Sequence, residues 1–525
     1  MGLTLPEQAP HELQNRMAHA LGEHFRAYLQ HGRILWNKVV CGFAAVTSYQ
    51  LIVTSQAPPQ IQNLSCPPPS GHLLFIILHR MNIIETLNAA GQQELAQHLE
   101  TLTGDARANL ERDILSQDWQ ELKALHAEKS AASLSDNVSG DLTPMPWKLA
   151  TDDLRYDFWK ETGEILLGKG QVAAFLVAGG QGSRLGFDGP KGMFDIGLPS
   201  HKSLFQLQAE RLRNLGARVE HAIPWCIMTS PLNHEATVNF FKEHDYFGLN
   251  REDIRFFQQG TICALTADGK AVRDGNDHLA LVPDGNGGCF RALAQSGTLA
   301  WLVERGVQYV FLYSVDNALC RICDPAFIGA LTEKGNMLSA SKVVHKAGPN
   351  EKVGIFAFQN KKPGVVEYSD LPENFRDMTN ADGSLTFDGG NIAIHLFKIS
   401  GLRKLQTSKL PWHTARKTVC GVEKCFKFEQ FLFDAFPQLG SMLPFGVIRE
   451  EEFSPVKNAE GNDSPKTART MIGKLHRDWL RKAHVKIDEK KLYEISPTIS
   501  YAGEGLKQSV FDRELGINIL EFEEN

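Results

Sequence analysis

The chain has 525 residues, of which 22% are charged and 42% hydrophobic, an ordinary composition for a globular protein of two or three domains. Its net charge of −6 disfavours broad binding to nucleic acid but leaves room for a local cationic pocket. Nine cysteines form no disulfide or zinc framework, so we expect reduced thiols and a cytoplasmic protein.

The first 80 residues differ from the rest of the chain. A Pro/Ser/Gln-rich stretch at 57–70 is typical of a linker. The apolar run at 34–54 is interrupted by polar residues, and the run at 73–78 is far shorter than the ~20 residues that span a bilayer. The start has no secretory signal pattern. We therefore expect residues 1–80 to be a poorly structured extension, and we hypothesise that Met81 is a natural first residue.

Helical and strand-like patterns then follow in order. Leucines recur at helical spacing from Ile83, which predicts an N-terminal helical region at 81–165. Residues 166–435 alternate strand-like and helical runs, which favours an α/β sheet, and 436–525 form a small C-terminal domain. The expected strands are Val172–Ala178, Trp225–Thr229, Ile254–Gln258, Tyr309–Val315, Leu338–Val344, Gly354–Gln359 and Asn391–Phe397.

A glycine-rich loop directly follows the first of these strands. Gly179, Gly180 and Gly182 allow backbone N–H groups to approach an anion closely, and Arg184 and Lys191 add positive charge. The glycine spacing is one residue too long for the dinucleotide fingerprint, and Lys191 lacks the following Ser or Thr of a P-loop. The stretch predicts a phosphate-binding loop of another kind.

Further polar residues follow later strands, where α/β sheets place their sites. The Gln259 amide offers the donor and acceptor that match a uracil edge. Gly285 and Asn286, in P-D-G-N-G-G, could lie against a base or ribose, although the same letters are typical of a plain turn. Asp316 could hold Mg²⁺ through one oxygen, although such an Asp is as often a turn residue.

The order of these motifs resembles a known family. L-x-A-G-G-x-G-S-R-L-G, P-K-G, P-D-G-N-G-G and V-D-N are similar to the UTP:sugar-1-phosphate uridylyltransferases, and most of all to the UDP-N-acetylhexosamine pyrophosphorylases among them. The resemblance covers about residues 90–510. It implies an α/β fold: a Rossmann-like nucleotidyltransferase domain with a mixed sheet, packed N-terminal helices and a small β-rich C-terminal domain.

The resemblance also implies roles for individual residues. The nucleotide-binding residues would be Leu176, Gly179, Gly180, Gly182, Gln259, Gly285 and Asn286. The sugar-binding residues would be Gly354, Glu367, Tyr368, Asn391, Phe431 and Phe433, with core packing equally open for the two rings. Asp316 would hold Mg²⁺, and the catalytic residues would be Arg184, Lys191 and Lys457. Departures from the family at Asp388-Gly389 and Ile394–Leu396 leave the choice of sugar open.

The implied activity is uridylyl transfer. UTP and N-acetylglucosamine 1-phosphate would yield UDP-N-acetylglucosamine and pyrophosphate by in-line attack on the α-phosphate, chiefly through positioning and charge neutralisation. The alternatives are a sister enzyme for glucose 1-phosphate and a non-catalytic nucleotide-sugar-binding paralogue; the loop spacing disfavours a dinucleotide oxidoreductase. We expect UTP and a sugar 1-phosphate as partners, no nucleic acid or membrane, and a monomer or homodimer.

Overall fold

The computed structural model describes residues 34–36, 51–53, 83–131, 141–368 and 370–524. The chain divides into two units at Thr101, and each is described by itself. In the first, β1 (Ile34–Trp36) pairs antiparallel with β2 (Leu51–Val53), residues 83–89 are helical, and α4 is Gln93–Thr101. The rest of the predicted extension, and the question of Met81, lie outside the described residues.

The second unit begins with α5 (Gly104–Leu115) and α6 (Trp119–Ala131). Their apolar faces are buried, and polar groups tie them to the following α/β region: Gln117 accepts a hydrogen bond from the Cys263 N–H at 2.8 Å, and His278 bonds Asp113 at 2.9 Å. The expected packing of N-terminal helices on the catalytic region is confirmed for these two. Every described helix is too short or too polar to cross a lipid bilayer.

A mixed ten-stranded sheet forms the centre of the second unit, with the strand order β14-β13-β15-β11-β4-β5-β6. Strands β11, β4, β5 and β6 are parallel, and β15 runs antiparallel to β11. All the strands expected from the sequence are present, and β3, β14 and β18 were not expected. The bounds are β3 (Leu142–Pro144), β4 (Val172–Val177), β5 (Trp225–Thr229), β6 (Ile254–Gln258), β11 (Tyr309–Ser314), β12 (Ser339–His345), β13 (Ile355–Gln359), β14 (Lys362–Val366), β15 (Gly389–Lys398) and β18 (Leu443–Gly446).

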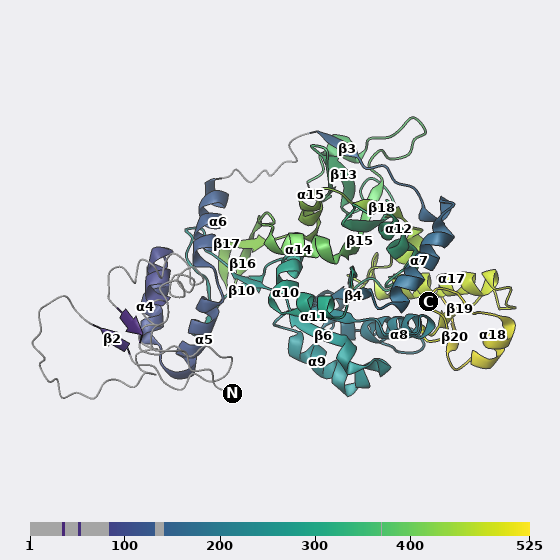
Figure 1. Cartoon of the computed structure of the whole chain (residues 1–525), viewed down its shortest axis with the longest axis horizontal. Helices are drawn as coiled ribbons and strands as arrows, with labels where there is room; N and C mark the ends of the chain where they lie inside the picture. The colour runs from purple at the N-terminus through teal and green to yellow at the C-terminus, as the bar shows by residue number, and fades with distance from the viewer. Residues whose placement is uncertain (1–33, 37–50, 54–82, 132–140, 369, 525) are drawn as a thin grey trace, which may run out of the picture. The chain divides into compact units, whose positions relative to one another are not determined.

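Helices cover both faces of this sheet (Figure 1). Leu176 of β4 packs into a core with residues of α7, α8, α9 and α12. The neighbouring Phe175 packs into a second core with residues of α10, α11, α14 and α15. Because both faces are covered, β4 is apolar throughout instead of alternating. The bounds are α7 (Tyr156–Gly168), α8 (Leu204–Arg218), α9 (His234–Glu243), α10 (Cys289–Gln295), α11 (Thr298–Glu304), α12 (Pro325–Glu333), α13 (Glu373–Arg376), α14 (Ile399–Thr407), α15 (Ala435–Leu439) and α16 (Arg449–Glu452).

Small elements complete the unit. In the C-terminal part, α17 (Pro465–Lys482) and α18 (Gln508–Glu514) share a core with the antiparallel pair β19 (Leu492–Ile495) and β20 (Ile519–Phe522), in line with the small β-containing region expected there. The predicted boundaries at 165 and 435 stay predictions. Three further antiparallel pairs are β7 (Thr261–Cys263) with β10 (Leu281–Pro283), β8 (Arg273–Asp274) with β9 (His278–Leu279), and β16 (His413–Val419) with β17 (Val422–Glu429).

A buried ion cluster ties β12 to the end of α16. Lys342, which is fully buried, donates to Asp324 at 2.8 Å and to Glu452 at 2.6 Å. Burial opposes the charge of Lys342, but the two carboxylates outweigh it, and the pKa of Lys342 is raised. Glu452 directly precedes the segment that carries Lys457, so this cluster helps to fix that segment.

Substitution of Lys342 by Met is expected to lower the free energy of unfolding by about 3–5 kcal/mol, because it leaves buried carboxylates without their ammonium partner. Urea unfolding measures this loss. The matched control is Lys474→Met: its ion pair with Glu524 is about half exposed, and its loss should be below about 1 kcal/mol. Equal losses in both variants would contradict the structural role of the cluster.

Candidate functional site

The parallel strands end side by side, and polar residues follow each end. In the sheet register, Val177 of β4 lies opposite Met228 of β5 and Ser314 of β11, and Thr229 lies opposite Gln258 of β6. The glycine loop, Ser230–Asn233, Gln259 and Asp316 therefore leave the sheet at one edge. This is the edge at which open α/β sheets bind their ligands.

The glycine loop folds back on itself. The N–H of Gly182 donates to the carbonyl of Gly189 at 2.9 Å, and the N–H of Lys191 donates to the carbonyl of Gly180 at 3.1 Å. Lys191 is therefore held beside the glycines. A Cβ atom on Gly179 would lie only 2.5 Å from the Oε1 atom of Gln259, so the predicted phosphate and uracil residues lie close together.

Asn233, which the sequence analysis missed, holds this loop from the next strand end. Its side chain is 1% exposed and donates to the carbonyls of Ala178 at 3.0 Å and Gly180 at 3.3 Å. Its Oδ1 atom accepts from the Ser230 N–H at 2.8 Å. The only signal in the sequence was its place a few residues after an expected strand. The hydroxyl of Ser230 is buried without a partner among the described residues.

The turn that contains Gly285 and Asn286 is bonded to the segment after β17. Gly285 has a φ of +89°, and a Cβ atom there would lie 2.3 Å from the carbonyl oxygen of Gln430, so glycine is needed on both counts. The N–H of Gly287 donates to the same carbonyl at 2.8 Å. The Oδ1 atom of Asn286 accepts from the N–H of Leu432 at 2.9 Å, which leaves its amide N–H₂ and one acceptor position on Oδ1 for a ligand.

The buried Asn317 ties the end of β11 to the segment that carries Lys457. Its amide donates to the carbonyl of Glu452 at 2.8 Å, and its Oδ1 atom accepts from the N–H of Ser454 at 2.9 Å. The N–H of Val456 donates to the carbonyl of Asp316 at 2.9 Å. Two segments far apart in the sequence are thereby joined beside Asp316.

The three predicted catalytic cations act on one another around Asp316. The Lys191 ammonium lies 3.9 Å from the Asp316 carboxylate. Burial is the main cause that lowers the pKa of Lys191; the charges of Arg184 and Lys457 lower it further, and Asp316 opposes them. Burial likewise raises the pKa of Glu367, against the opposing charge of Lys457. The cations and Glu367 therefore belong to one electrostatic site.

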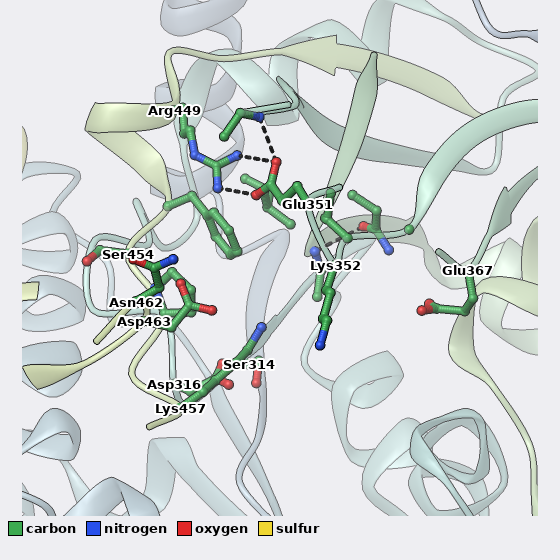
Figure 2. A pocket seen from close by; sticks show the side chains of 18 of the residues that line it. Ser314, Asp316, Glu351, Lys352, Glu367, Arg449, Ser454, Lys457, Asn462 and Asp463 are labelled. Atoms are coloured by element: carbon green, nitrogen blue, oxygen red, sulfur yellow. Dashed lines mark hydrogen bonds and ion pairs between the residues drawn. The ribbon is translucent and has the colours of Figure 1, made fainter. Parts of the chain in front are cut away.

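A cavity of about 1000 Å³ opens over this cluster, at the upper end of the usual size for small-molecule sites. In Figure 2, Asp316 and Lys457 lie together at one end and Glu367 lies away from them. The predicted site residues that line the cavity are Asn286, Asp316, Gly354, Glu367, Asn391, Phe433 and Lys457.

The other predicted residues lie outside the cavity lining. The side chain of Leu176 is buried in the core, and that of Tyr368 is 41% exposed. Phe431 stacks on Phe433 with 5.1 Å between the ring centres. The remaining residues lie in the glycine loop and at the neighbouring turns and strand ends: Gly179, Gly180, Gly182, Arg184, Lys191, Gln259 and Gly285.

Three of the expected sugar-binding residues, Gly354, Glu367 and Asn391, lie together at the far end of the cavity. The N–H of Asn391 donates to the carbonyl of Gly354 at 2.8 Å, and a Cβ atom on Gly354 would lie 3.2 Å from the Glu367 carboxylate. His395 lines the cavity; burial lowers its pKa to about 3, so it is neutral near pH 7. Asp388 instead bonds His345 and Trp147 and is not part of the lining.

Comparisons with known proteins agree on one family. Residues 141–515, which include the whole cavity lining, match the family described as UTP–glucose-1-phosphate uridylyltransferase. UDP-N-acetylglucosamine diphosphorylase 1 of Arabidopsis thaliana is 38% identical over 463 residues, covering 82% of this chain and 90% of that protein. UDP-N-acetylglucosamine pyrophosphorylase of Saccharomyces cerevisiae is 37% identical, covering 82% and 94%. The crystal structure of the uridine diphosphate N-acetylglucosamine pyrophosphorylase from Trypanosoma brucei aligns with a TM-score of 0.72 and 28% identity, covering 83% and 95%.

The lowered pKa of Lys191 predicts unusual chemical reactivity. Because an amine reacts only when deprotonated, Lys191 should be acetylated by acetic anhydride at a pH below the range of an ordinary lysine, whose pKa is 10.5. Mass spectrometry across a pH series measures the extent of modification at each lysine. A midpoint for Lys191 at or above 10.5 would contradict the crowding of cations described here.

Proposed function

The chain belongs to the UTP–glucose-1-phosphate uridylyltransferase family, and we propose that it joins UTP to N-acetylglucosamine 1-phosphate and releases pyrophosphate. The observation that carries this proposal is the convergence of Arg184, Lys191 and Lys457 around Asp316, beside a cavity large enough for a nucleotide sugar. The relatives named above act on the acetamido sugar by their names.

The proposed reaction needs no nucleophilic side chain. The phosphate oxygen of the sugar phosphate attacks the α-phosphorus of UTP in line, the bond to the bridging oxygen breaks, and pyrophosphate leaves. The loop amides and Arg184 hold the leaving pyrophosphate, Gln259 binds the uracil edge, and Lys191 and Lys457 neutralise the charge that grows around the α-phosphate. The protein contributes position and positive charge.

Asp316 suits a magnesium ion. It is a partly exposed carboxylate just after the end of a strand, and Mg²⁺ in phosphate-transfer sites takes one or two carboxylates, substrate phosphates and waters. The described residues hold no cluster of three metal-ligating side chains, so the phosphates would supply further ligands. When bound, the ion adds positive charge beside the phosphates, and Asp316 would hold it there.

The sugar specificity rests on the far end of the cavity. Glu367 and Asn391 offer an acceptor and an amide to hydroxyl and acetamido groups, and neutral His395 adds polar surface. Glucose 1-phosphate is the alternative substrate, and a binder without turnover is the alternative class. We also propose a cytoplasmic location, since the described cysteines are unpaired, and a monomer or homodimer.

The deciding experiment follows pyrophosphate release from UTP and Mg²⁺, with N-acetylglucosamine 1-phosphate, N-acetylgalactosamine 1-phosphate and glucose 1-phosphate in parallel. We expect N-acetylglucosamine 1-phosphate to give the highest kcat/KM. Preference for glucose 1-phosphate would move the protein to the sister activity. Silence with all three, from protein that still binds UDP-N-acetylglucosamine, would favour the non-catalytic binder.

Lys457→Ala should reduce kcat about 10²–10³-fold, the usual cost of removing one group that stabilises transition-state charge, while the Kd for UTP changes little. Steady-state kinetics and titration calorimetry measure the two quantities. The control is the exposed Lys490→Ala. Equal losses in turnover and UTP affinity would argue against a transition-state role.

Asn233→Ala should raise the KM for UTP about tenfold while the KM for the sugar phosphate stays within about twofold, because its lost hydrogen bonds hold the phosphate loop and the neighbouring Ser230. The exposed Asn250→Ala serves as the control. An equal rise in both KM values would show a general loss of structure instead.

A further inference from the structure

Three cations line the cavity, and the structure gives them different surroundings. Arg449 forms an ion pair with Glu351. The Lys457 ammonium lies 5.9 Å from the centre of the Phe453 ring, and its charge acts on Lys191 and Glu367. Lys352 makes no hydrogen bond or ion pair with any described residue. In Figure 2, its side chain extends from its loop into the cavity.

The loop that carries Lys352 joins β12 to β13 and is held in place. The Glu351 carboxylate binds the Arg449 guanidinium through two hydrogen bonds and accepts from the N–H of Ala347 at 2.7 Å. Both charged side chains are about four-fifths buried, so solvent screens this pair less than a surface pair. At the start of the loop, the N–H of Lys346 donates to the carbonyl of Asp388 at 2.9 Å.

The position of Lys352 favours a binding role over that of an ordinary surface lysine. Two residues later the chain reaches Gly354, which contacts Asn391 and lies beside Glu367 at the proposed sugar end. In Figure 2 the Lys352 side chain lies between Glu367 and Lys457. A sugar 1-phosphate bound with its ring near Glu367 and its phosphate directed toward Lys457 would present that phosphate to Lys352.

We propose that Lys352 binds the phosphate of the incoming sugar 1-phosphate, and that the Glu351–Arg449 pair positions it. The proposal rests on the function proposed above. Two polyanions must meet in this cavity, and the proposed reaction already assigns Arg184, Lys191 and Lys457 to the nucleotide phosphates. A further ammonium offsets the repulsion between the two substrates and forms a charge-assisted hydrogen bond with the acceptor phosphate. After transfer, that phosphate is the β-phosphate of the nucleotide sugar.

The test compares Lys352→Met, which keeps the length of the side chain and removes its charge, with Lys352→Arg and with the control Lys362→Met, an exposed lysine on β14 outside the cavity lining. For Lys352→Met we expect the KM for the sugar phosphate to rise roughly 10–100-fold, with the KM for UTP within about twofold. In the reverse reaction the KM for UDP-N-acetylglucosamine should rise and that for pyrophosphate should not. Lys352→Arg should recover most of the loss.

Glu351→Gln tests the positioning role. It should raise the KM for the sugar phosphate by less than Lys352→Met does. The double variant should be no worse than Lys352→Met alone, because Glu351 acts only by positioning the Lys352 ammonium, which the double variant lacks. Additive losses would overturn the positioning role. Equal KM changes for both substrates, or none, would overturn the role of Lys352.

A binding measurement keeps this inference separate from the proposed function. Titration calorimetry with UDP-N-acetylglucosamine and with UTP needs no turnover. Lys352→Met should weaken the first roughly 10–100-fold and leave the second unchanged, whether or not the wild type is active. Inactive wild-type protein would defeat the proposed function, and equal affinities of Lys352→Met and wild type for UDP-N-acetylglucosamine would defeat the inference.

Discussion

The geometry of the site depends on one buried amide, that of Asn317. Its hydrogen bonds to Glu452 and Ser454 hold the end of β11 against a segment more than 130 residues later in the chain. Asp316 and Lys457 each lie next to one side of that link. The ion cluster of Lys342 also holds this segment through Glu452. A buried polar network therefore fixes the positions of Asp316 and Lys457.

Because the buried network fixes these residues in place, the positive charges of the site remain close to one another. Partial burial and the neighbouring cations lower the pKa of Lys191, so the ligand-free site is electrostatically unfavourable and a polyphosphate would relieve it. Preorganised positive charge of this kind needs no rearrangement when negative charge develops. The crowded cations therefore oppose folding, and the same residues favour a bound anion.

The sequence pattern was sufficient to predict those parts of the structure that depend only on neighbouring residues. A strand covered on both faces is apolar throughout, and a loop that admits an anion needs glycine, so Val172–Val177 and Gly179–Gly182 could be recognised from the sequence. Asn233, Asn317 and Lys352 could not. Their roles come from contacts with distant segments or from the direction of a side chain into a cavity, and neither leaves a periodic signal. Strands β3, β14 and β18 were missed because they are short and each contains a proline, which argues against a strand in a sequence.

The turn at 283–288 and the segment at 430–433 are bonded to each other through Asn286 and Gly287. One carries residues predicted for the nucleotide, and the other carries the paired rings predicted for the sugar. A displacement of either must therefore be transmitted to the other. An engineer who replaces Phe431 and Phe433 should therefore exchange both segments together, because hydrogen bonds join them.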